Sequence, residues 1–419
     1  MAAPSSPKPA SDRSVVAAAF AAIALFVVSW TLLHVGFYKH KQLLDTPVYQ
    51  RYGNAIADGK VPYRDFKVEY PPGALPVFAL PGLAEPGRDQ HVSTGFRRSF
   101  ETLMWLCGAA ALAAMAVILR TLRRSAKNVW AALCFAAVAP LLLGSVILSR
   151  FDLWPAALVT GALAALVSGR LRLGHALLGL GVAVKLYPAV FVPLVIAFAW
   201  KRAGRREAIT CLAVALGVVA AVFAPFVILA PDGVWHSLSV QLSRPLQVES
   251  LGSALLLVGH HIFGLGVTGE TSHGSQNLAG HAADWLAVIS TVLQAGVLIW
   301  IWAAFARGRG DAEALVRSTA AALCAFIAFG KVLSPQFMIW LIPVVPLVRG
   351  RRGVGVSALL GVALVLTQIW FPFRYFRLSL DFEAGLSWVL LARDLTLVAL
   401  VAVLVVSLRR TTATRPESP

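Results

Sequence analysis

Apolar stretches long enough to cross a bilayer recur along nearly the whole chain, with short polar segments between them. They occupy residues 14–38, 100–119, 128–170, 174–200, 209–230, 284–305, 317–349, 354–371 and 385–408. A helix needs about 20 predominantly apolar residues to span the hydrocarbon core of a membrane. The pattern therefore predicts an all-α polytopic membrane protein, and it excludes a soluble multidomain protein.

Basic residues, which are typical of cytoplasmic loops, flank two of these runs on both sides, so each run must cross the membrane outward and return. Each is nevertheless too short for two full spans. The first is the run at 174–200, and the second lies between Arg317 and Arg349. We predict that each forms a tight hairpin of two short helices, because a proline interrupts it at KLYP (185–188) or at SPQ (334–336). Counting every hairpin arm gives about twelve membrane helices.

The net charge of +17 comes mostly from basic clusters between the apolar runs, at residues 120–127, 170–172, 201–206, 307–309, 349–352 and 409–410. In a soluble protein this charge would suggest nucleic-acid binding, but here the clusters are typical of cytoplasmic loops. We therefore predict that the protein lies in the plasma membrane and that both of its termini are cytoplasmic. The predicted organisation is a disordered tail at 1–13, a single polytopic domain at 14–408 and a second tail at 409–419.

A long extracytoplasmic loop, residues 39–99, follows the first span, and its polar part at 45–73 gathers ionisable and aromatic residues. Thr46 and Pro47 predict the start of a short helix, and Asp58-Gly59 predicts its end. Its apolar residues fall on one face, which is typical of a helix on the membrane surface: Val48, Tyr49, Tyr52 and Ile56. The VPYRDF and EYPPG segments that follow predict a rigid loop.

Asp45 stands just before this helix, at the outer end of the first span. The helix dipole favours a carboxylate there and lowers its pKa, which makes it a weaker base. A dry pocket or a nearby acid such as Asp65 or Glu69 would raise that pKa again. Because a carboxylate at this position has little structural reason to be there, we interpret Asp45 as a functional residue.

Other polar residues occupy the breaks between apolar runs on the side of the first loop, namely Arg150, Asp152, Lys185, Tyr187, Lys331 and Gln336. Charges at this depth are costly unless they are paired or face water. Their convergence predicts a polar cavity that opens to the outer leaflet. Two structural alternatives remain open, an ion pair between Arg150 and Asp152 and a Lys185 that only extends to the interface.

A second outer region, residues 231–283, contains Arg244, Glu249 and an apolar piece at 251–267. Both flanks of that piece face outward, so we predict that it is re-entrant or interfacial. Arg244 and Glu249 either belong to the site or pair with each other within the loop.

The order of these features resembles that of the GT-C superfamily of glycosyltransferases. Along the chain come a first helix, Asp45, Tyr49 and Tyr52, and then VPYRDF, EYPPG, SRFD, VKLYP and LSPQ. More closely, the chain resembles the actinobacterial polyprenyl-phosphate-mannose-dependent α-mannosyltransferases, the group that includes the enzyme completing polar phosphatidylinositol mannosides. The resemblance covers residues 14–408 and implies a GT-C fold.

The resemblance also implies roles. Asp45 would be the catalytic base, and Lys185, Arg150 and Arg244 would bind the phosphate of a polyprenyl-phosphate sugar donor, whose sugar would be mannose. The acceptor would be a hydroxyl of a lipid or glycan on the extracytoplasmic face, and a single displacement would invert the anomeric carbon. The implied substrate-binding residues are Tyr49, Tyr52, Tyr63, Asp65, Glu69, Tyr70, Asp152, Tyr187, Glu249 and Gln336. Any catalytic histidine of the family would be one of His260, His261, His273 and His281.

Two other classes of protein are weighed against this one. About twelve helices with broken segments also fit a transporter or flippase of lipid-linked sugars, but no two-half repeat is visible and the ionisable residues gather toward one face. A non-catalytic partner in a cell-envelope complex would be expected to lack Asp45 or the cationic turn residues. No cofactor or nucleic-acid partner is indicated, although Asp45, Asp65 and Glu69 are acids that would support a divalent cation.

Overall fold

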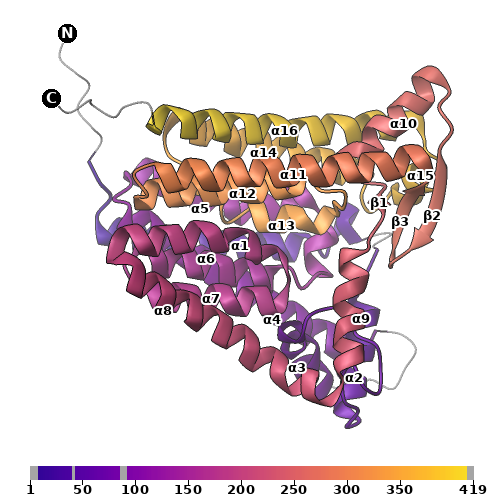
Figure 1. Cartoon of the computed structure of the whole chain (residues 1–419), viewed down its shortest axis with the longest axis horizontal. Coiled ribbons are helices and arrows are strands. Elements are labelled where there is room, and N and C mark those ends of the chain that lie inside the picture. Colours follow the sequence, from indigo (N-terminus) through magenta and orange to yellow (C-terminus); the bar gives the residue numbers. More distant parts are fainter. Residues whose placement is uncertain (1–7, 40–42, 85–91, 413–419) are drawn as a thin grey trace.

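The computed structural model describes residues 8–39, 43–84 and 92–412. Its helices run side by side in one bundle (Figure 1). The first and last described residues lie at one end, here called the terminal end, and short helices with a small sheet gather at the other, here called the loop end. Residues 1–7 and 413–419 of the predicted tails lie outside the described residues. The helix α16 continues to Thr412, four residues into the predicted second tail.

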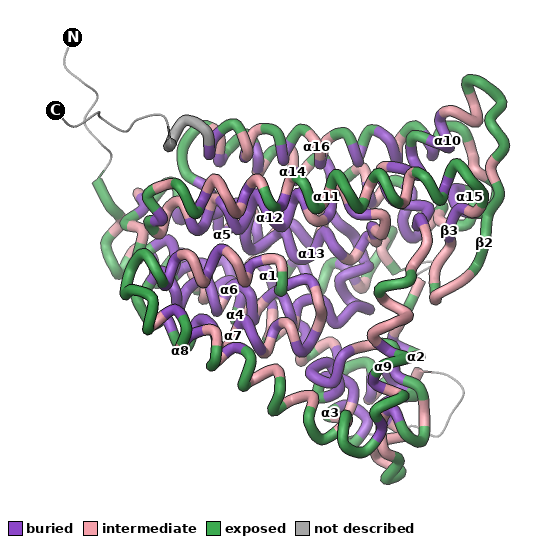
Figure 2. The backbone as a smooth tube through the Cα atoms, in the orientation of Figure 1, coloured by how far each residue is buried: buried purple, intermediate pink, exposed green. Residues whose placement is uncertain are grey.

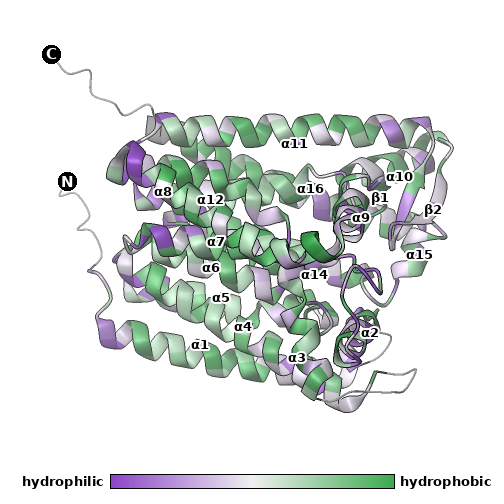
Figure 3. Cartoon of the chain, turned by 60° about the horizontal axis from the view of Figure 1, so that its bottom comes forward, coloured by the Kyte–Doolittle hydropathy of each residue, from purple (hydrophilic) through white to green (hydrophobic). Residues whose placement is uncertain are grey.

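Seven helical segments among the described residues are long and apolar enough to cross a membrane. Hydrophobic positions cover the length of the helices, while hydrophilic ones gather toward the ends of the bundle (Figure 3). This confirms the prediction of an all-α polytopic membrane protein. The seven are α1 (Asp12–Leu32), α4 (Thr94–Thr121), α5 (Ala126–Leu143), η4 (Tyr187–Phe191) continuing into α8 (Val192–Leu229), α11 (His281–Arg307), α14 (Gly350–Trp370) and α16 (Ala384–Thr412).

Both predicted hairpins are present. In the first, α7 stops before Lys185 and the chain returns through η4 into α8, which packs on α7. Gly204 interrupts α8 with a φ of 82°, a backbone conformation that favours glycine, so α8 consists of two helical segments. In the second hairpin, α12 ends before the break at 329–334 and the chain returns through short helical turns. The shorter elements are α6 (Leu153–Val167), α7 (Leu171–Val184), α12 (Ala312–Ala328), η5 (Pro335–Phe337), α13 (Met338–Leu341) and η6 (Val345–Leu347).

The loop end is built from short helices that follow the long ones. The predicted surface helix is α2, and its predicted end at Asp58 is right. Its N-cap is Asp45 and not Thr46, and the Asp45 side chain makes no capping hydrogen bond because an arginine engages it, as described below. The elements here are η1 (Gly36–Lys39), α2 (Thr46–Ala57), η2 (Pro72–Ala74), α3 (Pro76–Ala84), η3 (Ser145–Leu148), α9 (Pro231–Leu242), α10 (Leu251–Phe263) and α15 (Tyr375–Ser379).

The apolar face of α2 packs against the protein. Tyr49 is 1% exposed and stacks on Phe78 of α3 at 4.5 Å between ring centroids. Gly53 and Gly82 bring α2 and α3 so close that a Cβ on either glycine would clash with the backbone of the other helix. Buried residues thus continue from the bundle to α2 (Figure 2). This packing fixes the position of Asp45 relative to the bundle.

A small antiparallel sheet at the loop end was not predicted. Its strands are β1 (Leu246–Gln247), β2 (Thr268–Ser272) and β3 (Ser275–Ala279), in the order β1-β3-β2. His273 and Gly274 form the two-residue turn between β2 and β3, and both have positive φ, as the turns favoured in such hairpins require. The sheet holds the segment before Glu249 in place, since Val248 donates its backbone N–H to Gln276.

Candidate active site

The charged turn between η3 and α6 is the centre of the candidate site. Asp152 is the N-cap of α6, yet its carboxylate makes no capping hydrogen bond and is fully buried. Instead, Oδ1 of Asp152 lies 2.6 Å from Nζ of Lys185 and accepts a hydrogen bond of 2.6 Å from Nε1 of Trp340. The turn before α6 is thereby joined to the break after α7 and to α13 in the second hairpin.

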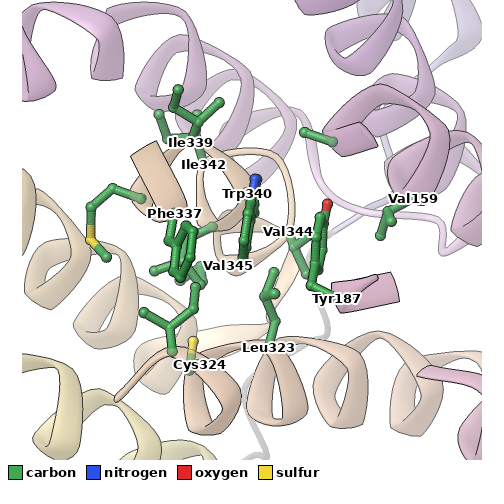
Figure 4. Packing of buried hydrophobic residues seen from close by; sticks show 14 of the residues in the cluster. Val159, Tyr187, Leu323, Cys324, Phe337, Ile339, Trp340, Ile342, Val344 and Val345 are labelled. Atoms are coloured by element: carbon green, nitrogen blue, oxygen red, sulfur yellow. The ribbon is translucent and has the colours of Figure 1, made fainter. Parts of the chain in front are cut away.

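Aromatic rings surround the Lys185 ammonium on several sides. Nζ lies 4.9 Å from the ring centroid of Phe151, 5.0 Å from that of Trp340 and 5.7 Å from that of Phe337. Trp340 is itself held between Phe337 and Tyr187, with ring centroids at 4.2 and 3.9 Å (Figure 4). Ring faces stabilise a cation at these distances. The ammonium is therefore fixed in position and does not extend freely to the interface.

Asp45 forms an ion pair with Arg150. The Arg150 side chain is 8% exposed and the Asp45 side chain is 31% exposed, so the carboxylate lies at the surface of the site and the guanidinium lies beneath it. Tyr49 donates a long hydrogen bond of 3.4 Å from its hydroxyl to the same carboxylate. The predicted base is thus brought directly to a predicted phosphate-binding cation.

Glu249 completes the cluster from the turn between β1 and α10. Its carboxyl is buried, and burial raises its pKa to about 7, against the charges of Arg393 and Arg244. Arg150 interacts electrostatically with both Asp152 and Glu249, and Lys185 interacts with Arg150 and Arg244. The turn before α6, the break after α7 and the turn before α10 therefore bring charges of both signs close enough to interact electrostatically.

Several polar atoms in this cluster are buried and have no hydrogen-bond partner among the described residues. They are Nε of Arg150, Oδ2 of Asp152, Oε2 of Glu249, Nε of Arg244 and the hydroxyl of Tyr187. Unpaired buried polar atoms are costly in folded proteins and tend to mark functional sites. Their concentration around one turn supports a site for a polar ligand.

Neither of the two ion pairs left open as structural alternatives forms in the described part of the chain. Arg150 pairs with Asp45 and not with Asp152, because Lys185 takes the Asp152 carboxylate. Arg244 donates a hydrogen bond of 2.9 Å to the backbone oxygen of His273, and no salt bridge joins it to Glu249 in the described part of the chain. The site is thus built from contacts between hairpins and loops, and the pairs nearest in sequence do not form.

The remaining candidates of the first loop are held by contacts within that loop or are exposed. Asp65 is exposed and bound by Arg64 at 2.9 Å, which with the Val61 N–H lowers its pKa to about 2. Tyr63 donates a hydrogen bond of 2.6 Å to the backbone oxygen of Tyr70. Tyr52 and Tyr63 are buried, Tyr70 is half-buried and Glu69 is exposed. The hypothesis that Asp65 acts on Asp45 as a neighbouring acid loses its support, because Arg64 neutralises Asp65.

The other polar candidates lie in local contacts. Gln336 accepts a hydrogen bond of 2.6 Å from Ser334, and the backbone oxygen of Lys331 accepts one from Gln247. The four histidines of the second outer region contact loop atoms or lie exposed: His260 contacts Leu265, His261 contacts Ser387, His273 contacts Ser243 and Ser272, and His281 is exposed. No group of three or more potential metal ligands occurs in residues 8–39, 43–84 and 92–412, so Asp45, Asp65 and Glu69 do not form one.

The buried pair of Arg393 and Asp394 in α16 was not among the predicted site residues. Both side chains are 0% exposed, and Nε of Arg393 lies 2.7 Å from Oδ1 of Asp394. Arg393 also donates a hydrogen bond of 2.6 Å to the backbone oxygen of Glu249, and its guanidinium lies 5.6 Å from the ring of Trp370. An ionisable pair inside an apolar run is rare enough to be a signal of function, and it was visible in the sequence.

A pH dependence of stability follows from Glu249. Its pKa is about 7 in the folded protein and 4.5 ordinarily, so the folded state binds more protons between these values and stability falls as pH rises through them. We expect Glu249→Gln to raise the midpoint of thermal unfolding by a few degrees at pH 8 and to change it little at pH 5. Glu270→Gln, in an exposed position on β2, is the matched control. An equal effect of Glu249→Gln at both pH values would contradict this account.

The sequence model of glycosyltransferase family 87 matches residues 69–335. The chain belongs to glycosyltransferase family 87. Among solved structures it is similar to the crystal structure of ArnT from Cupriavidus metallidurans in the apo state, with 14% sequence identity, a TM-score of 0.47, and coverage of 94% of this chain and 77% of that chain. A comparison with curated proteins found no match. Family 87 membership makes the protein a membrane glycosyltransferase and sets the transporter interpretation aside.

The family match covers most residues of the charged cluster but not Asp45. Arg150, Asp152, Lys185 and Glu249 lie within the matched residues 69–335, whereas Asp45 precedes them. The structure joins the two parts through the ion pair of Asp45 with Arg150.

Proposed function

We propose that this family 87 glycosyltransferase moves mannose from a polyprenyl-phosphate donor to a hydroxyl of a lipid or glycan acceptor, on the extracytoplasmic side of the plasma membrane. The charged cluster lies at the loop end, and the basic clusters at 170–172, 201–206 and 349–352 join helices at the terminal end (Figure 1). The positive-inside rule then favours a cytoplasmic terminal end and an outward loop end. A lipid donor with its chains in the bilayer would present its phosphosugar at that depth.

The observation that carries this proposal is the ion pair of Asp45 with Arg150 beside the buried Lys185–Asp152 pair. It brings a carboxylate and two cations together around the turn before α6. Glycosyl transfer from a lipid phosphate needs both: a base for the acceptor hydroxyl and positive charge for the departing phosphate.

The proposed reaction is a single in-line displacement. The acceptor oxygen forms a bond to the anomeric carbon as the bond from that carbon to the phosphate oxygen breaks, which inverts the configuration. The hydroxyl proton passes to the Asp45 carboxylate. The electron pair of the broken bond stays on the polyprenyl phosphate, whose added charge Arg150 and Lys185 stabilise, with Arg244 as a third cation near the phosphate.

Arg150 would link donor binding to activation of the base. Without donor, the Asp45 carboxylate is engaged by the guanidinium, and a carboxylate so engaged is a weaker base. A phosphodiester competes well for a guanidinium, because the planar fork fits two of its oxygens. Arrival of the donor would then draw Arg150 toward the phosphate and release Asp45 for the acceptor proton.

The other groups would hold the sugar and keep the cations in place. Trp340 and Asp152 orient the Lys185 ammonium, which still has donor hydrogens for a phosphate. Glu249, with a pKa of about 7, exists in both protonation states near neutral pH and can therefore donate or accept a hydrogen bond to a sugar hydroxyl. Tyr187, Gln336 and Tyr70 are the further candidates for substrate contact from the surrounding turns.

The proposal is tested by the choice of donor. Membranes containing the wild-type protein would be supplied with radiolabelled polyprenyl-phosphate mannose, arabinose or glucose and a lipid extract from the host, and labelled products would be separated by chromatography. We expect a new labelled product only with the mannose donor. Transfer from a different lipid-linked sugar would overturn the sugar assignment, and the absence of transfer from all three donors would overturn the donor class.

A further inference from the structure

A cavity of about 790 Å³ opens at the terminal end of the bundle, away from the charged cluster. It lies between α4, α6 and α7, and Pro9, Ala10 and Asp12 at the start of α1 close one side of it. The volume is within the range of ligand pockets in proteins. Its floor and its rim differ in chemistry, and the difference indicates what kind of molecule fits.

The floor is an apolar groove along the helices. Small residues line it on α4 and α6, and Leu173 and Leu177 form a wall on α7; the small residues are Ala113, Ala114, Gly161, Ala164 and Ala165. From Ala113 to Thr121 the α4 helix rises about 12 Å at 1.5 Å per residue. Because α4 is one of the helices long and apolar enough to span a membrane, this part of the groove lies at hydrocarbon depth.

The rim is basic. Arg120 forms an ion pair with Asp12 and donates two hydrogen bonds of 2.7 Å to its carboxylate. Arg123 and Arg170 also line the cavity, both are exposed, and neither forms an ion pair within the described part of the chain. The first residues of α7 follow Arg170 directly, and their free backbone N–H groups add to the positive potential. The rim therefore carries two uncompensated positive charges above an apolar groove.

We propose that this groove binds one anionic glycerophospholipid from the leaflet at the terminal end. The phosphate contacts Arg123 and Arg170, and an acyl chain follows the groove over Ala113 and Gly161. Basic pockets between membrane helices on the cytoplasmic side are suited to anionic headgroups. A soluble anion would use the rim but would leave the groove, at hydrocarbon depth, without a function. This site is separate from the proposed catalytic site and does not depend on its assignment.

The test is lipid binding by the full-length protein in detergent, followed by native mass spectrometry. Phosphatidylglycerol is titrated against phosphatidylcholine of the same acyl chains. We expect one phosphatidylglycerol molecule to bind with preference, and Arg123→Gln with Arg170→Gln to weaken it about 30-fold, the effect of two arginines near an anionic lipid. Ala113→Trp, at an exposed position of the groove, should weaken binding with all charges kept.

The matched control is Arg205→Gln with Arg206→Gln, which removes two exposed arginines from the same end outside the cavity. This control should bind phosphatidylglycerol as the wild type does. Equal binding of the two lipids, or wild-type affinity in the Arg123 and Arg170 double variant, would overturn the proposal. Competition by glycerol phosphate as strong as that by the intact lipid, with no effect of Ala113→Trp, would show a headgroup site alone and would overturn the assignment of the groove.

Discussion

Replacing Asp45 with asparagine should lower the rate of sugar transfer by at least about 100-fold, and by up to about 10,000-fold, the range that a general base contributes. The amide keeps the size of the side chain but cannot accept the acceptor proton. It also cannot form an ion pair with Arg150, so the guanidinium becomes free for the donor phosphate. We therefore expect kcat to fall while the KM for the donor stays the same or decreases. Initial rates with radiolabelled polyprenyl-phosphate mannose at varied concentration measure both.

Asp58→Asn is the matched control, because Asp58 is an exposed aspartate at the opposite end of the same helix, α2. It should transfer sugar at the wild-type rate. Transfer by Asp45→Asn at more than one tenth of the wild-type rate would exclude Asp45 as the base. A raised KM with unchanged kcat would instead assign Asp45 to the orientation of Arg150. Either result leaves family 87 membership in place, so the mechanism is tested separately from the family.

The sequence predicts the membrane architecture well because the bilayer leaves few choices. Backbone polar groups in hydrocarbon must be satisfied within a helix, so apolar length translates directly into spans. The two hairpins could be predicted because Pro188 and Pro335 cannot continue a helix that needs its N–H groups. The α2 helix was equally predictable from Pro47 at its start and Gly59 at its end.

The sheet was harder to predict from the sequence. The strands β2 and β3 consist mainly of polar and small residues, which lack the alternation that marks a strand. The His273-Gly274 turn was the one local signal, since a glycine after a residue that tolerates positive φ is typical of a two-residue hairpin turn.

Which charges pair could not be predicted from spacing. Arg150 and Asp152 are neighbours in the chain, but Arg150 pairs with Asp45 from the first loop and Asp152 pairs with Lys185 from the next hairpin. The same holds for Tyr49, whose place on an apolar face is compatible with a membrane surface or with a protein core. Only the packing of α2 on α3 distinguishes the two. The sequence predicts candidate residues for the site, and the tertiary contacts decide what each one faces.

Arg393→Met should be among the most destabilising single substitutions in the bundle. It leaves the Asp394 carboxylate, 0% exposed and without a hydrogen-bond partner for either oxygen, as an unpaired buried charge. Removing one partner of a buried pair costs about 3–5 kcal/mol, whereas replacing both by apolar residues is often tolerated. We therefore expect Arg393→Met to lower the midpoint of thermal unfolding strongly and the double variant with Asp394→Leu to recover most of the loss. The pair of exposed Arg377 and half-buried Glu383 provides the control, since Arg377→Met leaves a carboxylate that still reaches solvent and should change the midpoint little. If the double variant stays as unstable as Arg393→Met, the hydrogen bond from Arg393 to the backbone of Glu249 is the larger contribution, and α16 then stabilises the fold chiefly by holding the Glu249 turn against the site.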